Sequence, residues 1–190
     1  MAEQRKPRAD GVRNRAKVLH AAIDAFATDG PTVPIHEIAR RAGVGTGTVS
    51  RHFPTKESLY EAIVQSVAKR LVTRAIELRA THEAGPALFE FLTSMAAEGA
   101  TNRALADALS GTGFDIAAAA AKGEHDLNHV LTELLSAAQR AGAVRPDVDA
   151  ADLKAFLVGC AVRERDTAAP AARDRMLTIV RDGLITVRRP

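Results

Sequence analysis

The segment from Val44 to Leu59 concentrates side chains that could recognise another molecule. It reads VGTGTVSRHFPTKESL and combines hydroxyl groups, glycines, an Arg–His pair and a lysine. Its GTG raises the idea of a phosphate-binding loop, but the dinucleotide-binding pattern needs glycine where Ser50 stands, and a P-loop needs Gly-Lys-Ser/Thr. Both motifs also follow a strand, whereas the apolar residues before Val44 have helical spacing. A nucleotide loop is therefore disfavoured.

The same segment is better explained as the second half of a helix-turn-helix over residues 34–53. Ala39, Gly43 and Val49 stand at relative positions 1, 5 and 11, where a tight crossing of two helices requires small or plugging residues. Gly43 supplies the left-handed backbone angle of the turn. Val44 and Val49 are expected to plug the second helix into the first, and this spacing is typical of DNA-binding helix-turn-helix units.

The charge of the chain is unevenly distributed. Residues 1–60 contain ten Lys/Arg against six Asp/Glu, whereas residues 61–190 contain sixteen against seventeen, so the net charges are +4 and −1. A basic excess confined to the end that carries the helix-turn-helix is the electrostatic pattern of a nucleic-acid-binding end.

Composition and apolar spacing predict an all-α protein of about nine helices and no sheet. Aromatic residues are 4% of the chain, and alanine and leucine dominate the apolar set, which favours helices packed on helices. We expect a flexible basic arm over residues 1–11, then a helix whose apolar stripe begins at Val12. The helical pattern is expected to break at Pro54, after which Thr55 caps a long helix.

Several classes of protein are disfavoured. Cys160 is the single cysteine, so it is expected to be a core residue rather than part of a disulfide framework. The basic N-terminus lacks an apolar signal region, and no apolar run approaches the roughly 20 residues of a membrane span. A cytoplasmic location is expected, without a membrane partner and without a cofactor. No catalytic motif is present, so the chain is not expected to be an enzyme.

One stretch resembles the N-terminal domain of the TetR family of transcriptional repressors. It reads IHEIARRAGVGTGTVSRHFPTKESLYEAIV, and its RHFPTKESL element is similar to the family pattern that follows the recognition helix. The later segments RALADALSGTGFD and AGAVRPDVDAADL resemble the SbtR-like branch. The resemblance implies a DNA-binding domain over residues 12–70 and an all-helical ligand-binding and dimerisation domain over residues 71–190.

The resemblance also implies a mechanism. A homodimer formed through the last two helices would bind a near-palindromic double-stranded DNA operator as a repressor, and an unidentified small-molecule effector would release it. The long helix from Lys56 to about Arg79 would connect the DNA-reading unit to the effector cavity. Two alternatives stay open, namely a DNA-binding architectural dimer without an effector and an all-helical enzyme.

The candidate DNA contacts lie around the second helix of the motif. Arg51 is suited to guanine or phosphate, and Thr48 is suited to a base edge, while glycines allow close approach to the groove. Family members usually carry Tyr at the place of Ser50 and often Thr at the place of Pro34. Two phosphate contacts of the family are therefore not expected in the same form in this chain. The full set is Thr32, Gly45, Thr46, Gly47, Thr48, Ser50, Arg51, His52 and Lys56.

The candidate ligand contacts are apolar residues that could line a cavity, with polar residues that could orient a ligand. His125 and His129 have the spacing of a metal pair on one helical face, but no third ligand is evident, so no metal site is expected. The set is Phe91, Met95, Leu109, Phe114, His125, Asn128, Leu131 and Arg163.

Overall fold

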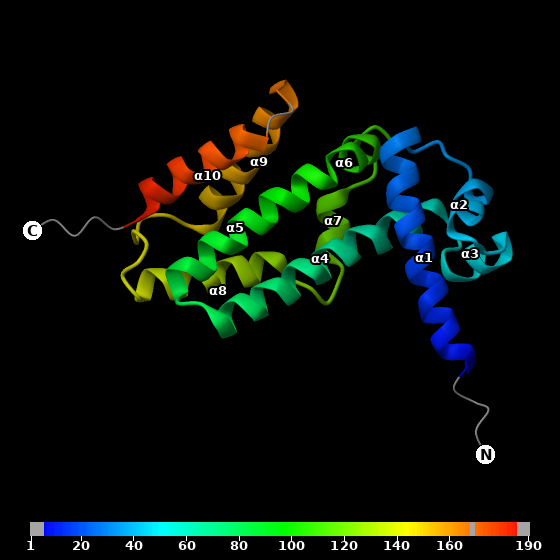
Figure 1. Ribbon diagram of the computed structural model, residues 1–190, viewed down its shortest axis with the longest axis horizontal. Helices are drawn as coiled ribbons and strands as arrows, with labels where there is room; N and C mark the ends of the chain where they lie inside the picture. The colour runs from blue at the N-terminus through cyan, green and yellow to red at the C-terminus, as the bar shows by residue number, and fades with distance from the viewer. Residues whose placement is uncertain (1–5, 168–169, 186–190) are drawn as a thin grey trace, which may run out of the picture. The chain divides into compact units, whose positions relative to one another are not determined.

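The computed structural model describes residues 6–167 and 170–185, and this part of the chain consists of helices joined by loops (Figure 1). It contains no strand, only one isolated bridge between Val144 and Ile185. The all-α prediction is confirmed. The described helices are α1 (Lys6–Asp29), α2 (Ile35–Ala42), α3 (Thr46–His52), α4 (Lys56–Thr81), α5 (Ala84–Thr101), α6 (Arg103–Ser110), α7 (Ile116–Ala121), α8 (Leu127–Arg140), α9 (Ala150–Thr167) and α10 (Pro170–Leu184).

The helices number ten in the described residues because the region before Arg140 is divided at Gly123. Asp126 accepts a hydrogen bond from the backbone N–H of His129 and so caps α8 at its N-terminus. Val187, which we expected on the last helix, lies outside the described residues.

The helices form two compact units. One comprises Met1–Ser66 and Asn102–Lys122, and the other comprises Val67–Thr101 and Gly123–Pro190. The predicted division near residue 70 lies close to the boundary within α4. It differs over residues 102–122, which group with the N-terminal unit because α6 packs against α1.

The core of the first unit explains how α3 is held. α1 contributes Phe26, which is buried together with Ile38 and Ala39 of α2. These residues pack with Val49 of α3 and Leu59 of α4 in one apolar cluster. Burial of such a cluster removes several large apolar side chains from water, which is the dominant favourable contribution to folding.

α1 differs from its predicted form at its N-terminal end. It begins at Lys6, so residues 6–11 of the predicted arm lie within a helix in the structure. Pro7 stands in the first turn, where the missing backbone N–H has no helical partner to lose. Val12 and Ala16 are exposed rather than part of the buried stripe, and burial on α1 starts at Val18.

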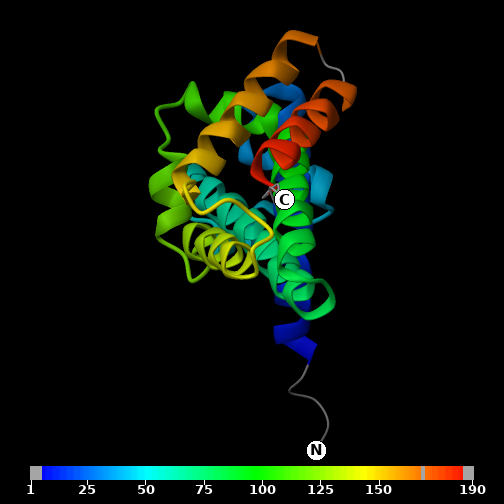
Figure 2. The ribbon, with the colours of Figure 1, turned by 90° about the vertical axis from the view of Figure 1, so that its left-hand side faces the viewer.

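The second unit is built around α5, which contacts α8, α9 and α10. Phe91, Leu131 and Leu153 belong to its buried cluster. At Gly85 a β-carbon would lie 2.8 Å from the Ala143 side chain, so this close approach requires glycine. Figure 2 shows α9 and α10 side by side, in orange and red. None of the described helices is both long and apolar enough to span a membrane.

Candidate nucleic-acid interface

The turn between α2 and α3 has the geometry expected from its sequence. Gly43 ends α2 with φ +66° and ψ 35°, a left-handed conformation that is favourable for glycine and costly for residues with a β-carbon. Its N–H donates to the Arg40 carbonyl, and the N–H of Val44 donates to the Ala39 carbonyl at 3.0 Å. These bonds satisfy backbone carbonyls at the end of α2 and set the direction of α3 relative to α2.

α3 is held through one face and exposed on the other. Val49 is its buried residue, and Val44 packs partly against the same cluster. Gly47 and Arg51, one helical turn apart, lie on the side away from Val49, and both are exposed. The prediction that Val44 and Val49 anchor α3 in the core is therefore confirmed.

The two glycines at the start of α3 are not required by the fold. A β-carbon at Gly45 or Gly47 would meet no atom within 4 Å, and neither residue has a positive φ. A glycine inside a helix costs roughly 0.5–1 kcal/mol relative to alanine. Their small size therefore leaves open space on the exposed side of α3.

Phe53 fixes the end of α3. Its ring is buried, and its backbone N–H donates to the Val49 carbonyl at 2.8 Å. The guanidinium carbon of Arg15 lies 5.3 Å from the ring centroid, within the range of a cation–π interaction. This contact connects α1 directly to the residue that follows α3.

Lys56 starts α4 and has a defined partner. Thr55 caps this helix, because its hydroxyl accepts a hydrogen bond from the backbone N–H of Ser58 at 3.1 Å. The Lys56 ammonium donates to the carbonyl of Pro31 at 3.0 Å, and the hydroxyl of Tyr60 donates to the same carbonyl at 3.2 Å. The loop between α1 and α2 is thereby attached to α4.

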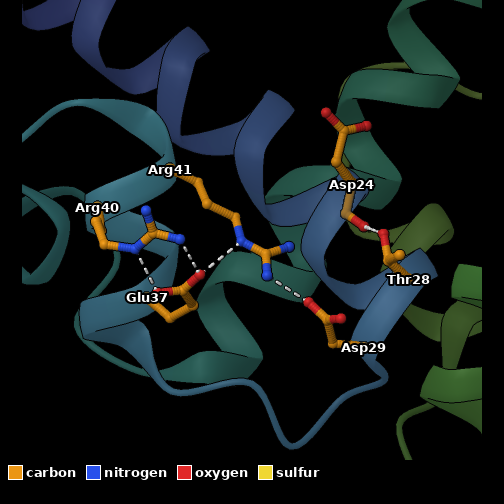
Figure 3. A network of polar contacts seen from close by, with 6 residues as sticks. All are labelled: Asp24, Thr28, Asp29, Glu37, Arg40 and Arg41. Carbon is orange, nitrogen blue, oxygen red and sulfur yellow. Dashed lines mark hydrogen bonds and ion pairs between the residues drawn. The ribbon is translucent and has the colours of Figure 1, made fainter.

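The two arginines of α2 are engaged in a network of ion pairs (Figure 3). Arg40 donates two hydrogen bonds of 2.7 Å to Glu37, and Arg41 donates to both Glu37 and Asp29. Hydrogen bonds from Arg40 and then from Arg41 lower the pKa of Glu37 to about 2. Arg41 thus links α2 to the end of α1, so a phosphate contact from it would compete with these carboxylates. Figure 3 also shows Thr28, whose hydroxyl donates to the Asp24 carbonyl.

The predicted DNA contacts belong to three connected segments. The α3 set is Gly45, Thr46, Gly47, Thr48, Ser50, Arg51 and His52, of which Thr48 and His52 are partly buried and the others are exposed. Thr32 follows Pro31 in the loop held by α4, and Thr32 and Lys56 line one cavity. No ion pair involves Arg51 within the described residues.

Sequence reasoning missed two parts of this region. Tyr60 is buried, and its ring meets the rings of Phe26 and Phe114 edge-on, with centroids 5.1 and 5.4 Å away. The Glu37 network was also missed, although Glu37 precedes Arg40 and Arg41 by three and four residues, a spacing that places side chains together on a helix. A search for such spacings would have found it.

The predicted ligand contacts do not form one group in the structure. Phe91 and Leu131 are core residues of the second unit, and Met95 packs partly against them. Leu109 belongs instead to the buried core of the first unit, and Phe114 is partly buried against that core. Phe114 lines a cavity of about 560 Å³ together with Tyr60 and Lys56, among others. A ligand role for each of these residues stays a prediction.

The polar members of the ligand set lie nearer the surface of the second unit. His125 is half-buried in the loop before α8. Asn128 is exposed and accepts a hydrogen bond of 3.3 Å from Lys154. Arg163 is exposed on α9. No group of three or more metal-ligating side chains occurs among the residues that the structure describes.

Comparison with known proteins places this geometry in a family. Residues 18–63 match the family described as bacterial regulatory proteins, tetR family. Residues 83–186 match the C-terminal domain of SbtR-like transcriptional regulators. The two matches cover the helix-turn-helix and most of the helices that follow it.

Solved structures agree along nearly the whole chain. A TetR transcription regulatory protein from Mycobacterium vanbaalenii is 46% identical, with a TM-score of 0.75, over 94% of this chain and 99% of that one. The TetR transcriptional regulator SCO0520 from Streptomyces coelicolor is 32% identical, also with a TM-score of 0.75, over 91% and 99%.

A curated relative matches over a shorter stretch. The HTH-type transcriptional repressor Rv3405c of Mycobacterium tuberculosis is 38% identical over 73 residues, which are 38% of this chain and 36% of that protein. The chain thus spans about a third of the length of that relative. Taken with the fold and the geometry of α3, the family matches show that the chain belongs to the TetR family of bacterial transcriptional regulators.

Proposed function

We propose that the protein is a repressor that binds a near-palindromic DNA operator as a homodimer and is released by a small-molecule effector. The observation that carries the proposal is the state of α3. Val49 anchors its buried side in the core, and Gly47 and Arg51 are exposed on its other side. Arg51 forms no ion pair within the described residues. Such a helix is suited to the major groove, where side chains can distinguish base pairs.

The candidate DNA contacts have different proposed roles. Thr48 contacts base edges, Arg51 contacts guanine or phosphate, and Lys56 contacts a phosphate. Thr32, Ser50 and His52 complete the surface through hydrogen bonds to the DNA backbone. Phosphate contacts would set the orientation of the protein, and base contacts would set the preferred sequence.

The homodimer is supported by apolar side chains on the last two helices. Val158 and Val162 of α9 lie one turn apart and are 63% and 51% exposed, and Ile179 of α10 is 69% exposed. Large apolar side chains grouped on a surface favour association, and a twofold axis presents the same patch on both partners. The two copies of α3 would then enter major grooves about 34–36 Å apart or a multiple of it.

A small-molecule effector is supported by one structural relative. A gamma-butyrolactone receptor, described as ArpA-like, is 26% identical over 94% of this chain with a TM-score of 0.70. An effector would act by binding better to a dimer geometry whose α3 helices do not fit the operator spacing. Release of bound DNA by a panel of small molecules that includes a γ-butyrolactone tests this step. A dimer whose DNA affinity is unchanged by every compound favours the architectural alternative.

Fluorescence anisotropy tests the DNA contacts. A labelled duplex is first selected on the wild-type protein from a random-sequence pool. We expect the logarithm of its affinity to fall linearly with the logarithm of salt concentration, with a slope of about −0.9 for each phosphate contacted. Lys56→Ala should weaken all duplexes to a similar extent, whereas Thr48→Val should change the order of preference among duplexes. Selection that enriches no sequence, or binding that salt does not weaken, would overturn the proposal.

A further inference from the structure

The carbonyl of Pro31 joins two side chains of α4. It accepts the hydrogen bond from the Lys56 ammonium at 3.0 Å and the one from the Tyr60 hydroxyl at 3.2 Å. A carbonyl oxygen has two lone pairs, so both bonds can form together. Because Lys56 and Tyr60 stand one turn apart on the same helix, the carbonyl lies between two donors of a single rigid element.

Tyr60 is the fixed member of this arrangement. Its side chain is 3% exposed. The edge-to-face contacts with Phe26 of α1 and with Phe114, in the segment between α6 and α7, hold its ring from two sides. A tyrosine has only two rotatable side-chain angles, and both are restricted by this packing. The position of its hydroxyl is therefore set by three separate parts of the unit.

Lys56 is the adaptable member. Its ammonium carries three N–H donors and uses one of them on the Pro31 carbonyl. The remaining two are available to an oxygen of another molecule. A free lysine would lose much of its side-chain freedom on binding a phosphate, and a lysine that is already oriented loses less.

We propose that Tyr60 is a positioning residue for DNA binding, which holds the Pro31 carbonyl so that this carbonyl presents the Lys56 ammonium to a DNA phosphate. The inference rests on the proposed function, in which Lys56 contacts the DNA backbone. It assigns to Tyr60 no contact with DNA. Its effect on affinity therefore passes through Lys56, and the loss of its hydroxyl matters only while the ammonium is present.

A double-mutant cycle measures this dependence. Tyr60→Phe removes the hydroxyl and keeps the buried ring, while Lys56→Met removes the charge and keeps most of the stem. We expect Tyr60→Phe to weaken binding to the selected duplex about two- to tenfold, the effect of one hydrogen bond. In the Lys56→Met background the same change should alter affinity less than about twofold. An equal loss in both backgrounds, or no loss in either, would overturn the proposal.

A matched variant separates positioning from general weakening of the unit. Gln65 of α4 donates to the Ala119 carbonyl on α7, so Gln65→Met also removes one hydrogen bond between α4 and another segment of the same unit. It should leave DNA affinity unchanged at a stability similar to that of Tyr60→Phe, as measured by thermal unfolding. An equal loss of affinity in Gln65→Met would overturn the specific role of Tyr60.

The same experiment distinguishes the two levels of the argument. If Lys56→Met weakens binding and Tyr60→Phe does not, the positioning role is wrong while the phosphate contact stands. If Lys56→Met leaves affinity and its salt dependence unchanged, the phosphate contact of the proposed function fails, and the positioning role fails with it.

Discussion

Gly47 offers a test in which stability and DNA binding should change in opposite directions. It stands in the first turn of α3, where a β-carbon would meet no atom of the protein within 4 Å and where φ is not positive. Gly47→Ala should therefore stabilise the fold by about 0.5–1 kcal/mol, since alanine has the higher helix propensity. For a chain of 190 residues this corresponds to a rise in Tm of about 1–4 °C.

The methyl group of the alanine in Gly47→Ala should obstruct the approach of α3 to the DNA groove. If Gly47 approaches DNA closely, the added carbon must overpack the interface, and overpacking costs about 1–3 kcal/mol. At about 1.4 kcal/mol for each factor of ten, affinity should fall about 5- to 150-fold. Differential scanning calorimetry gives the change in Tm, and anisotropy with the selected duplex gives the change in affinity.

Gly99 provides the matched control. It is an exposed glycine within α5, and a β-carbon there also meets no atom within 4 Å. Gly99→Ala should raise Tm by a similar amount and leave DNA affinity unchanged. A Gly47→Ala protein that is stabilised and binds DNA as well as the wild type would refute the close approach of α3 to the groove.

Three further predictions concern the charges and surfaces described above. Glu37 has a pKa of about 2 in the folded chain against an ordinary 4.5, so its ion pairs stabilise the fold above about pH 4.5 and are lost as pH falls toward 2. Glu37→Gln should therefore reduce the pH dependence of the free energy of unfolding, measured with urea, across this interval. An unchanged pH dependence in this variant would count against the network. Burial, and then the charge of Glu57, raise the pKa of Tyr60 above 10.0, so the phenolate absorbance of this single tyrosine should rise with a midpoint above pH 10.0. A midpoint at or below 10.0 in the folded chain would contradict its burial. Replacing Val158 and Val162 together by Glu should yield a monomer in analytical ultracentrifugation, because two charges would be placed in the apolar dimer surface of α9. A dimer retained by this variant would show that the surface is not the dimer interface.

Local spacing predicted the helix-turn-helix well because its constraints are local. The turn needs glycine at Gly43, and the crossing of two short helices needs Ala39 and Val49, so the sequence expresses the geometry directly. The cap at Thr55 follows the same logic. These features depend on residues only a few positions apart.

Contacts between distant segments were harder to predict. Leu109 and Phe114 have the same apolar character whether they line a ligand cavity or complete the core beside α1, and only the tertiary fold places them in the first unit. Tyr60 likewise acquires its role from Pro31, 29 positions earlier. At the N-terminus, the basic residues Arg5, Lys6 and Arg8 suggested a flexible arm, but Pro7 is compatible with the first turn of a helix that continues into a packed segment.

Methylation protection of the wild-type protein on its selected duplex tests the central claim most directly. Dimethyl sulfate reacts with guanine N7, which lies in the major groove. Two α3 helices in a twofold dimer should protect guanines in two clusters whose centres lie about 10 base pairs, or a multiple of that distance, apart. Tight binding of the duplex without any protection at N7 would contradict the insertion of α3 into the major groove.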